Sequence, residues 1–446
     1  MRSHLSVCIV LLAAVLAAPT WVFAQGGVAV DAQGVLQRKE LADQGGRLTR
    51  ERALAAKAAL NPKVAAYSKL RKVSLNRLEK AIADHQNVLT DEMRYLAGLL
   101  RVRYVFYYPE TKDIVLAGPA EGWTTDVVGR VIGIGSGRPV IQLEDLVVAL
   151  RAFPSGGDPT KFIGCSIDPT QEGLAAMQQF LRSIGSTNPN VTPEYIVSGL
   201  QSNLGLQTIS VMGVPPKTHF AQVMVEADYR MKLIGIGLEK PPVRLVSYVD
   251  RASPTGVARN ALQRWFFTPD YQCVRTADDG LAMELVGDGV KLVGEDELVM
   301  AGGQRKVAGR ADRASQAFVS SFTKVYSELA DRSPVYAQLR NLIDLIVTSA
   351  YIEQQDFYGK ADWKMELFGD EKEFPVETCN APKQVAAAIN AIWKGSRLMT
   401  PIGGGVNIQP AQFLQTDHRL PDADGHVAKL RQQTKIELAK GQWWWD

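Results

Sequence analysis

One stretch of the chain brings together residue types that could do chemistry. His219 is followed closely by Asp228, Arg230 and Lys232. An imidazole, a carboxylate and two cations near one another could bind an anion or a carboxylate, and could transfer protons in a hydrolase. We therefore take these four residues as candidates for ligand binding. The sequence assigns no residue a catalytic role.

The same stretch is also explained by helix formation alone. From His219 to about Ile234 the apolar residues recur at helical spacing. Glu226 stands four residues before Arg230, and Asp228 stands four before Lys232. In this order each acid–base pair supports a helix by roughly 0.2–0.5 kcal/mol. On a helical wheel the charged residues flank the apolar stripe on opposite sides, so a solvated helix face remains an alternative to a pocket.

Other short motifs are more simply structural. The run Gly133-Ile-Gly-Ser-Gly137 leads into an apolar strand instead of a helix, so it does not match a phosphate-binding loop. Ser321-Phe-Thr-Lys324 lies within an amphipathic helix, and Asp422-Ala-Asp-Gly425 lacks the other ligands of a calcium loop. Gly-x-Ser-x-Gly, His-Glu-x-x-His and paired Cys-x-x-Cys motifs are absent. We therefore expect no cofactor and no metal site.

The N-terminal residues predict a cleavable signal peptide, Met1 to Ala24. Arg2 gives the start a positive charge, the run from Leu5 to Ala18 is almost wholly apolar, and small residues precede the expected cut. The apolar run is shorter than the roughly 20 residues that span a membrane. We expect an exported protein, periplasmic, in the cell envelope or secreted, with no transmembrane anchor after cleavage.

The overall composition favours a globular protein without a nucleic-acid partner. Of the 446 residues 46% are hydrophobic, and this length suggests two or three domains. The formal net charge is +3 and becomes +2 when Arg2 leaves with the signal peptide. Since no run of Lys or Arg is concentrated on one segment, we expect no binding to nucleic acid.

Three cysteines follow the signal peptide: Cys165, Cys273 and Cys379. In an oxidising compartment they could form one intrachain disulfide and leave one thiol, which could also link two chains. We favour three buried thiols without a disulfide. A disulfide-linked multimer stays open as an alternative.

Residues 25–100 predict a helical N-terminal region. They are rich in Ala, Leu, Lys, Arg and Glu, and Thr90 followed by two acids is a typical helix start. The next residues differ in character. Arg101 to Tyr108 and Asp113 to Ala117 flank a turn and predict a β-hairpin.

Residues 101–300 predict a mixed α/β core. Strand and helix patterns alternate from Pro139 to Met212, starting with a strand over Pro139 to Leu143. Between Arg264 and Val293, strand-like runs are separated by turn residues such as Gly287-Asp-Gly289. This pattern indicates an antiparallel meander.

Residues 301–360 predict a helical hairpin packed on the core, because apolar stripes from Phe318 to Leu329 and from Val335 to Ala350 are joined by a short turn. Residues 361–446 predict an irregular C-terminal region, in which Pro401-Ile-Gly-Gly-Gly-Val406 forms a loop. The expected fold class is α+β or mixed α/β, with a helical N-terminal region, a mixed sheet core containing an antiparallel meander, and a C-terminal antiparallel helix pair.

Several stretches resemble a known family. They are Asp113-Ile-Val-Leu-Ala-Gly-Pro-Ala-Glu-Gly-Trp123, Gly137 to Arg151, Ser166-Ile-Asp-Pro-Thr170, Val225-Glu-Ala-Asp-Tyr-Arg-Met-Lys232 and Asp279-Gly-Leu-Ala-Met-Glu-Leu285. Together they resemble the exported planctomycete family catalogued as domain of unknown function number 1598, over much of residues 100–355. The resemblance implies export and a signal peptide. It brings no activity, cofactor or catalytic residue.

The sequence favours a binding or structural protein over an enzyme. Catalytic motifs are absent, the net charge is near zero, and the sequence ends in Trp443-Trp-Trp-Asp446, a kind of aromatic cluster that often marks a contact surface. We predict a non-enzymatic exported component of the cell envelope, with another envelope protein or a cell-wall component as partner. The alternative is a hydrolase or small-ligand-binding protein with a pocket around His219 and Asp228 to Lys232.

Overall fold

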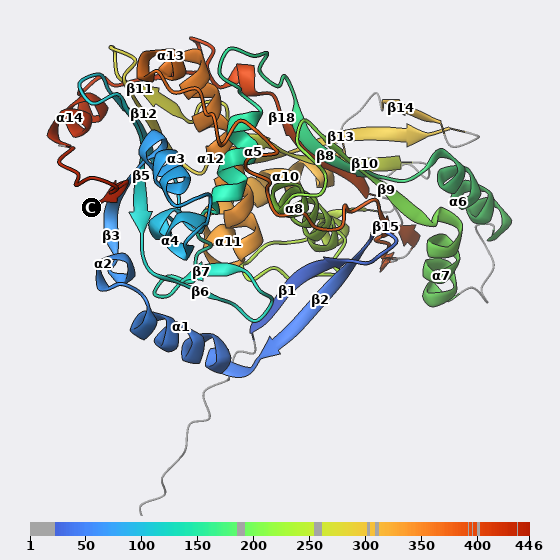
Figure 1. Ribbon diagram of the computed structural model, residues 1–446. Coiled ribbons are helices and arrows are strands. Elements are labelled where there is room, and N and C mark those ends of the chain that lie inside the picture. Colours follow the sequence, from blue (N-terminus) through green and yellow to red (C-terminus); the bar gives the residue numbers. More distant parts are fainter. Residues whose placement is uncertain are drawn as a thin grey trace, which may run out of the picture.

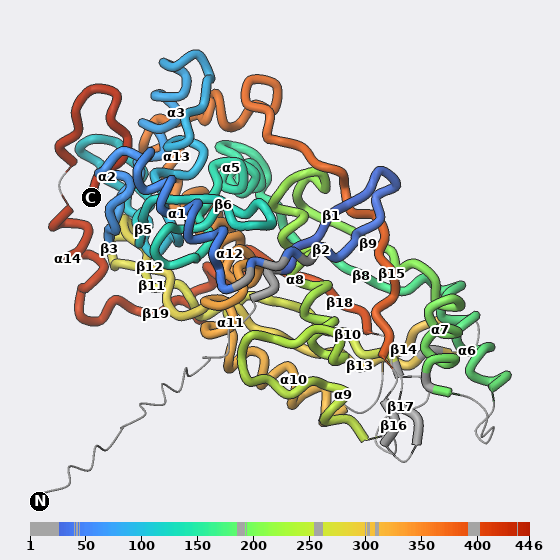
Figure 2. Tube along the Cα trace, turned by 90° about the horizontal axis from the view of Figure 1, so that it is seen from below, coloured from blue at the N-terminus to red at the C-terminus, as the bar shows by residue number. Residues whose placement is uncertain are grey.

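Figures 1 and 2 show the computed structural model of the chain. It describes residues 23–184, 192–253, 261–300, 304–307, 312–390, 392–394, 396–398, 402–434 and 436–446. Nearly all of the expected signal peptide lies outside these residues, so its cleavage stays a prediction. Among the helices of the described part, none is long and apolar enough to cross a membrane.

The larger of two main sheets has nine strands. Its order is β1 (Phe23–Val30), β2 (Val35–Asp43), β15 (Gln384–Ala386), β9 (Leu206–Met212), β8 (Ile163–Asp168), β18 (Ile402–Ile408), β10 (Ala261–Pro269), β13 (Val290–Val299) and β14 (Arg305–Val307). Neighbouring strands are antiparallel, except that β15 runs parallel to β2 and β18 runs parallel to β10. Segments from both ends and the middle of the sequence therefore meet in one sheet.

The second main sheet has seven strands. Its order is β19 (Leu420–Pro421), β11 (Val274–Thr276), β12 (Ala282–Leu285), β4 (Tyr104–Tyr108), β5 (Asp113–Ala120), β3 (Ser68–Ser74) and β20 (Trp444–Trp445). Two small hairpins pair β6 (Trp123–Thr125) with β7 (Val131–Gly133) and β16 (Ile392–Lys394) with β17 (Ser396–Leu398). Both main sheets contain parallel as well as antiparallel pairs. Together with the helices described next, they confirm the expected fold class of mixed α and β elements.

The described part holds fourteen α-helices and three short 3-10 helices. The helices are α1 (Arg47–Ala59), α2 (Pro62–Ala65), α3 (Leu75–Asp84), α4 (Asp91–Arg94), α5 (Leu143–Arg151), α6 (Gln171–Ile184), α7 (Pro193–Leu204), α8 (His219–Gly235), α9 (Tyr248–Arg251), α10 (Arg313–Lys324), α11 (Tyr326–Arg332), α12 (Pro334–Gln354), α13 (Phe357–Ala361) and α14 (His426–Gln433), with η1 (Gln44–Gly46), η2 (Leu96–Gly98) and η3 (Pro410–Gln412). Figures 1 and 2 show α12 in the middle of the molecule, between β5 and β8.

Helices α8 and α12 form the centre of the fold. The Thr218 side chain starts α8 by accepting a hydrogen bond from the backbone N–H of Ala221. From there α8 packs on β8 and β18 and contacts α5 and α12. Every residue of α12 from Val335 to Ile352 is buried. A helix buried on all sides belongs to the interior. The single apolar stripe seen in the sequence therefore indicated only part of its buried surface.

The predicted helical region, residues 25–100, is helical only in part. β1, β2 and β3 are strands, and the turn between β1 and β2 uses Gly34 at φ +85° and the Asp31 carboxylate, which accepts the N–H groups of Gln33 and Val35. Helix-forming composition is a weak signal where strand pairing buries more surface. The helix start at Thr90 is confirmed, because its side chain accepts the N–H of Met93.

The local predictions between residues 101 and 212 hold better. β4 and β5 form the expected hairpin, with Tyr108 opposite Asp113. The helices and strands expected after residue 143 are present as α5, β8, α6, α7 and β9. The strand predicted from Pro139 is wrong. Pro139 makes only an isolated bridge to Ile132, and Leu143 already begins α5.

The predicted antiparallel meander is also wrong. β10 and β13 pair with each other in the nine-stranded sheet, whereas β11 and β12, which lie between them in sequence, form a hairpin in the seven-stranded sheet. Turn residues fix the hairpin but not the sheet that it joins. That choice depends on the pairing of β12 with β4, far away in sequence.

The C-terminal predictions need two corrections. Residues 402–406 of the expected loop belong to β18, a central strand whose glycines allow close approach, since a Cβ at Gly404 would lie 1.9 Å from the Trp265 carbonyl oxygen. The helix pair is not a simple hairpin. α11 packs on α12, but α10 packs mainly on β13.

Candidate functional site

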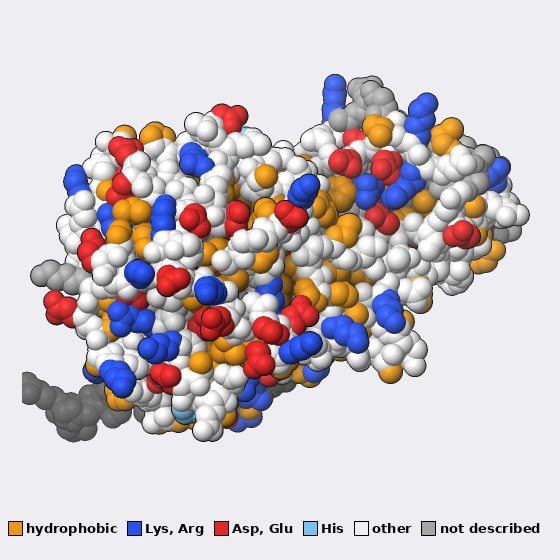
Figure 3. Space-filling view, turned by 45° about the horizontal axis from the view of Figure 1, so that its top comes forward, with side chains coloured by type: hydrophobic (Ala, Val, Ile, Leu, Met, Phe, Trp, Pro, Cys, Tyr) orange, Lys and Arg blue, Asp and Glu red, His pale blue; other side chains and the backbone are white. Residues whose placement is uncertain are grey.

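A cleft of about 450 Å³ opens where several segments of the chain meet. Its walls come from β1, β2, the β6–β7 loop, the start of α5, the N-terminal half of α8, and the segment 377–379, with Tyr95 and α12 completing them. The charged and amide side chains on its surface are Lys39, Arg130, Gln142, Glu144, His219, Gln222, Glu226, Gln338 and Glu377. Figure 3 shows acidic and basic side chains interspersed over one face of the molecule, without a patch of a single sign.

His219 forms the best-defined pair in the cleft with Asp145. The imidazole Nδ1 lies 2.9 Å and 3.0 Å from the two oxygens of the Asp145 carboxylate. Asp145 is buried, while the His219 side chain keeps 26% of its surface exposed to the cleft. Burial alone would lower the pKa of His219, but the charge and hydrogen bond of Asp145 outweigh it and raise the pKa.

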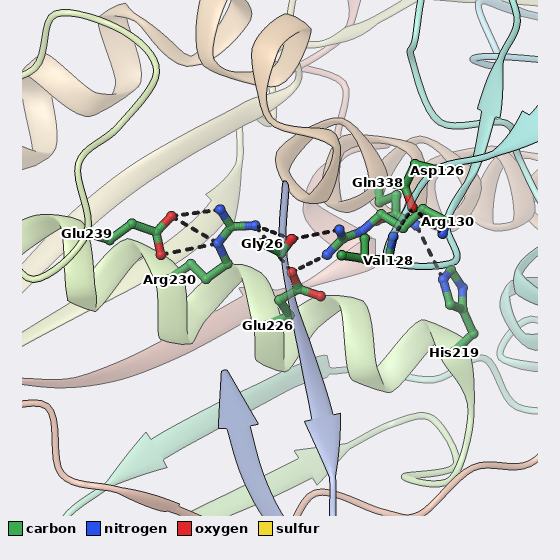
Figure 4. A network of polar contacts seen from close by, with 9 residues as sticks. All are labelled: Gly26, Asp126, Val128, Arg130, His219, Glu226, Arg230, Glu239 and Gln338. Atoms are coloured by element: carbon green, nitrogen blue, oxygen red, sulfur yellow. Dashed lines mark hydrogen bonds and ion pairs between the residues drawn. The ribbon is translucent and has the colours of Figure 1, made fainter. Parts of the chain in front are cut away.

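Gln338 fixes the other side of the His219 ring. Arg130 Nε donates to Gln338 Oε1 at 3.1 Å, so the amide nitrogen of Gln338 must face His219 Nε2, 3.3 Å away. An amide N–H can only donate, and His219 Nε2 therefore accepts while Nδ1–H donates to Asp145. Figure 4 shows this chain of contacts from Arg130 to His219. In the neutral imidazole this arrangement selects the tautomer that carries its proton on Nδ1.

Glu144 lies beside this pair in the same cleft. Burial is the largest influence on its carboxyl group, and the charges of Asp145 and Glu377 act in the same direction, so that its pKa is raised to about 7 despite the opposing effect of His219. Arg94 approaches Glu377 at 3.2 Å. Within the described residues no Lys or Arg forms an ion pair with Glu144.

Arg130 and Arg230 anchor the cleft to the N-terminal strand. Their Nη1 groups donate to the same acceptor, the backbone carbonyl oxygen of Gly26, at 2.8 Å and 3.1 Å (Figure 4). Glu226 lies between them and pairs with both, while Glu239 accepts from Arg230 at 2.7 Å. Burial lowers the pKa of Arg230, but Glu239 outweighs it and raises the pKa. This network is a structural anchor, and only its Arg130 and Glu226 ends reach the cleft.

Asp228 and Lys232 lie on the opposite face of α8. With 3.6 residues per turn, Asp228 is roughly half a turn away from His219. Both side chains are buried, and Lys232 Nζ donates to Asp228 at 2.7 Å and to the carbonyl oxygens of Ile167 and Gly404 at 3.1 Å and 3.2 Å. Burial raises the pKa of Asp228 to about 6, although Lys232 opposes it.

The structure therefore divides the four candidate residues. His219 lines the cleft, Arg230 lies just behind it, and Asp228 with Lys232 ties α8 to β8 and β18. Sequence reasoning missed Glu144 and Asp145, because two acids in the first turn of a helix are ordinary and stabilise it anyway. It also missed Arg130 and Gln338, whose role depends on contacts with residues far away in sequence.

The motifs judged structural have internal partners. The carboxylate of Glu121 accepts the backbone N–H groups of Gly135 and Ser136 at 3.1 Å and 2.9 Å, so the glycine-rich loop already holds an anion of the chain itself. Asp422 caps α14 through the N–H of Val427. Among the residues that the structure describes, no group of three or more His, Cys, Asp or Glu could hold a metal ion.

The cysteines of the described part are free. Cys165 and Cys273 are buried, and burial raises the pKa of each thiol. Cys379 is partly exposed at the cleft, where its thiol lies 3.2 Å from the Lys217 carbonyl oxygen. No intrachain disulfide forms among these three cysteines. A disulfide between two chains stays a prediction.

Comparison with known proteins gives a match for one segment of the chain. Neither the curated proteins nor the solved structures give a match. Residues 165–248 match the model of a family described as Protein of unknown function (DUF1598). The matched segment runs from β8 to α9 and contains two of the resembling stretches, at Ser166 and Val225, together with all of α8. Over residues 165–248 the chain is therefore similar to this domain of unknown function.

Proposed function

We propose that the chain is an exported protein that binds a small hydrogen-bonding ligand with an ammonium group in the cleft beside His219. The observation that carries this proposal is the position of Glu144, a carboxylate at the cleft surface that no Lys or Arg of the described part neutralises. The cleft, at about 450 Å³, is within the range of roughly 300–1,000 Å³ typical of small-molecule sites.

The other acids of the cleft already have partners. Asp145 pairs with His219, Glu226 with Arg130, and Glu377 with Arg94. Lys39 also lines the cleft, but the strongest charges acting on Glu144 are Asp145, His219 and Glu377. A ligand cation beside Glu144 would relieve the repulsion among these acids. The same repulsion acts with burial to raise the pKa of Glu144, and this raised pKa also supports the proposal.

Neutral donors and acceptors surround this position. Gln142 and Gln222 lie at the cleft surface, and Thr125 and Thr378 are exposed at its rim. Such groups orient a ligand that carries hydroxyl or amide groups next to its cation. The proposed ligand class is therefore a polar amine, such as an amino sugar, an amino alcohol or a peptide with a free amino group.

Export is supported by the N-terminal sequence, Met1 to Ala24, with its charge, apolar run and small residues before the expected cut. An envelope protein or cell-wall component as partner remains a proposal. Its support from the tryptophan tail is weaker now, because Trp443 is only 6% exposed and Trp444 and Trp445 pair with β3. We therefore favour a small ligand over a protein surface.

Binding of amines by the full chain tests the proposal directly. Isothermal titration calorimetry would compare glucosamine, ethanolamine and putrescine with glucose and ethylene glycol, which lack the cation. We expect an amine to bind, and Glu144→Gln to weaken it by about tenfold or more. The matched control Glu172→Gln, an exposed acid on α6, should bind as the wild type does. Equal binding of amines and neutral analogues, or an unaffected Glu144→Gln variant, would refute the proposal.

A second candidate function is hydrolysis of such a ligand. The hydrogen bond between Asp145 and His219 favours it, because an oriented imidazole at a cleft surface can act as a general base. Turnover of ester, amide and glycoside derivatives of a bound amine would test it. Activity that is lost in His219→Ala would support hydrolysis, and no turnover across these substrates would leave binding alone.

A further inference from the structure

The final residues of the sequence close one edge of the seven-stranded sheet. Trp444 pairs with Val73 and Trp445 with Lys72, and the N–H of Ser74 donates to the Trp443 carbonyl oxygen at 2.9 Å. Without this short strand, β3 would be an open sheet edge. The tail is therefore part of the fold and not an exposed contact surface.

Arg71 holds the tail from inside the molecule. Its side chain is completely buried, and its guanidinium donates to both carboxylate oxygens of Asp446, at 2.9 Å and 3.2 Å. The guanidinium also lies 4.8 Å from the centre of the Trp444 ring. Burial would raise the pKa of Asp446, but the hydrogen bonds and the charge of Arg71 lower it, as expected for a carboxylate that stays ionised in this pair.

The same guanidinium holds a strained part of the backbone. Arg71 Nη1 donates to the Ala97 carbonyl oxygen at 2.7 Å. Leu96 and Ala97 both have left-handed backbone angles, with φ of +47° and +53°, which non-glycine residues rarely adopt. Such a conformation persists only where its surroundings hold it.

This strained segment carries a residue of the cleft wall. Tyr95 lines the cleft and directly precedes Leu96. Its ring packs on Trp123 with ring centres 5.4 Å apart, and Tyr95 and Trp444 pack against the same buried cluster, which also contains Val131. Val131 lines the cleft as well. A continuous set of contacts thus runs from the tail to the ligand site.

We propose that residues 443–446 form a latch, in which Asp446 acts through Arg71 to hold Tyr95 in its place in the cleft wall. Asp446 and Arg71 are positioning residues and do not themselves line the cleft. The effect on ligand affinity rests on the proposed function, whereas the effect on the segment 94–99 does not.

The connection to the rest of the chain would let the latch open without unfolding. Residues 437 and 439–442 are exposed, and the described residues between α14 and β20 form no strand or helix. The Asp446 side chain itself is 45% exposed. Opening would thus separate the tail from β3, while α14 stays in place.

Hydrogen exchange of the full chain, followed by mass spectrometry, tests the latch. Asp446→Asn removes the charge and keeps all three indoles. We expect amide exchange in residues 94–99 to become about tenfold faster while exchange in α12 stays unchanged. Asp446→Glu, which keeps a carboxylate, should restore slow exchange in part. Glu437→Gln, an exposed acid in the connecting segment, is the matched control and should behave as the wild type.

Ligand affinity provides the second measurement. If the wild type binds an amine, Asp446→Asn should weaken that binding several-fold. Unchanged exchange in residues 94–99 of Asp446→Asn would overturn the latch whatever the ligand data show. Failure of every amine to bind the wild type, with faster exchange in Asp446→Asn, would refute the proposed function and leave the latch standing.

Discussion

At the scale of single residues, the carboxylates of the cleft differ in whether a positively charged side chain or an imidazole pairs with them. Asp145 holds His219, and Arg130 holds Glu226 and Gln338 in place. Glu144 shares the cleft without such a partner among the described residues. The ordered imidazole and the unneutralised acid lie on one surface, which is the basis for the proposed ligand chemistry.

Asp145→Asn should lower the pKa of His219, because burial would then be opposed only by the weaker effect of Glu144. In the wild type the pKa is raised above 6.5, so folding favours the protonated ring. The stability from this group is therefore present below its unfolded pKa and is lost as pH rises through the folded pKa. NMR titration of the ring protons checks the shift. A His219 pKa that is unchanged in Asp145→Asn would contradict this account.

At the scale of elements, α8 serves two functions with its two faces. One face carries His219 and Glu226 to the cleft, and the other buries Asp228 and Lys232 against β8 and β18. The buried pair therefore belongs to the stability of the sheet and not to ligand binding.

Lys232→Met should destabilise the protein by about 3–5 kcal/mol, because it leaves the buried Asp228 without its partner. The double variant Asp228→Asn, Lys232→Met should lose less, since no charge then remains unpaired. Urea denaturation followed by circular dichroism measures both. Equal losses in the single and double variants would show that the pair has no special role.

Gly404→Ala should cost about 3 kcal/mol or more, because the added Cβ would meet backbone atoms of Trp265 and the residue has φ of +121°. Gly441→Ala is the matched control. It also has positive φ, at +81°, but nothing lies within 4 Å of its Cβ position, so a cost of about 1 kcal/mol is expected. Thermal melts that fail to separate the two variants would argue against close strand approach at β18.

Elements with local signals could be predicted from the sequence. The hairpin of β4 and β5 and the helices α5 to α8 follow from turn residues, caps and spacing. β18 could not be predicted, because a run of glycines is typical of a loop. Here it forms a strand because it pairs with β10 and β8. In the site, His219 could be predicted as a candidate because an imidazole can transfer protons. Its partners Asp145 and Gln338 come from other helices, and no local pattern connects them with it.

At the scale of the whole molecule, the cleft forms only when distant parts of the chain assemble. β1 supplies one wall from the start of the described chain, and residues 377–379 supply another. The segment that matches the family model, residues 165–248, contributes α8 but neither Asp145 nor Arg130. The proposed ligand site is therefore formed by the folded chain and not by that segment alone.

Export should leave a chain that begins at Gln25. Cleavage after Ala24 removes the residues before it and keeps Gly26, whose carbonyl oxygen Arg130 and Arg230 hold. Intact-mass analysis of the protein recovered outside the cytoplasm checks the cut. A folded exported protein that retains residues 1–24 would contradict the prediction.

Proton release on amine binding tests the central claim most directly. Glu144 has a pKa of about 7, so near pH 7 it is about half protonated, and a cation bound beside it should favour the ionised form. Calorimetric titrations in buffers with different ionisation enthalpies measure the protons exchanged. The account predicts release of about half a proton per amine at pH 7, and none in Glu144→Gln. Proton uptake, or equal release by the wild type and Glu144→Gln, would contradict it.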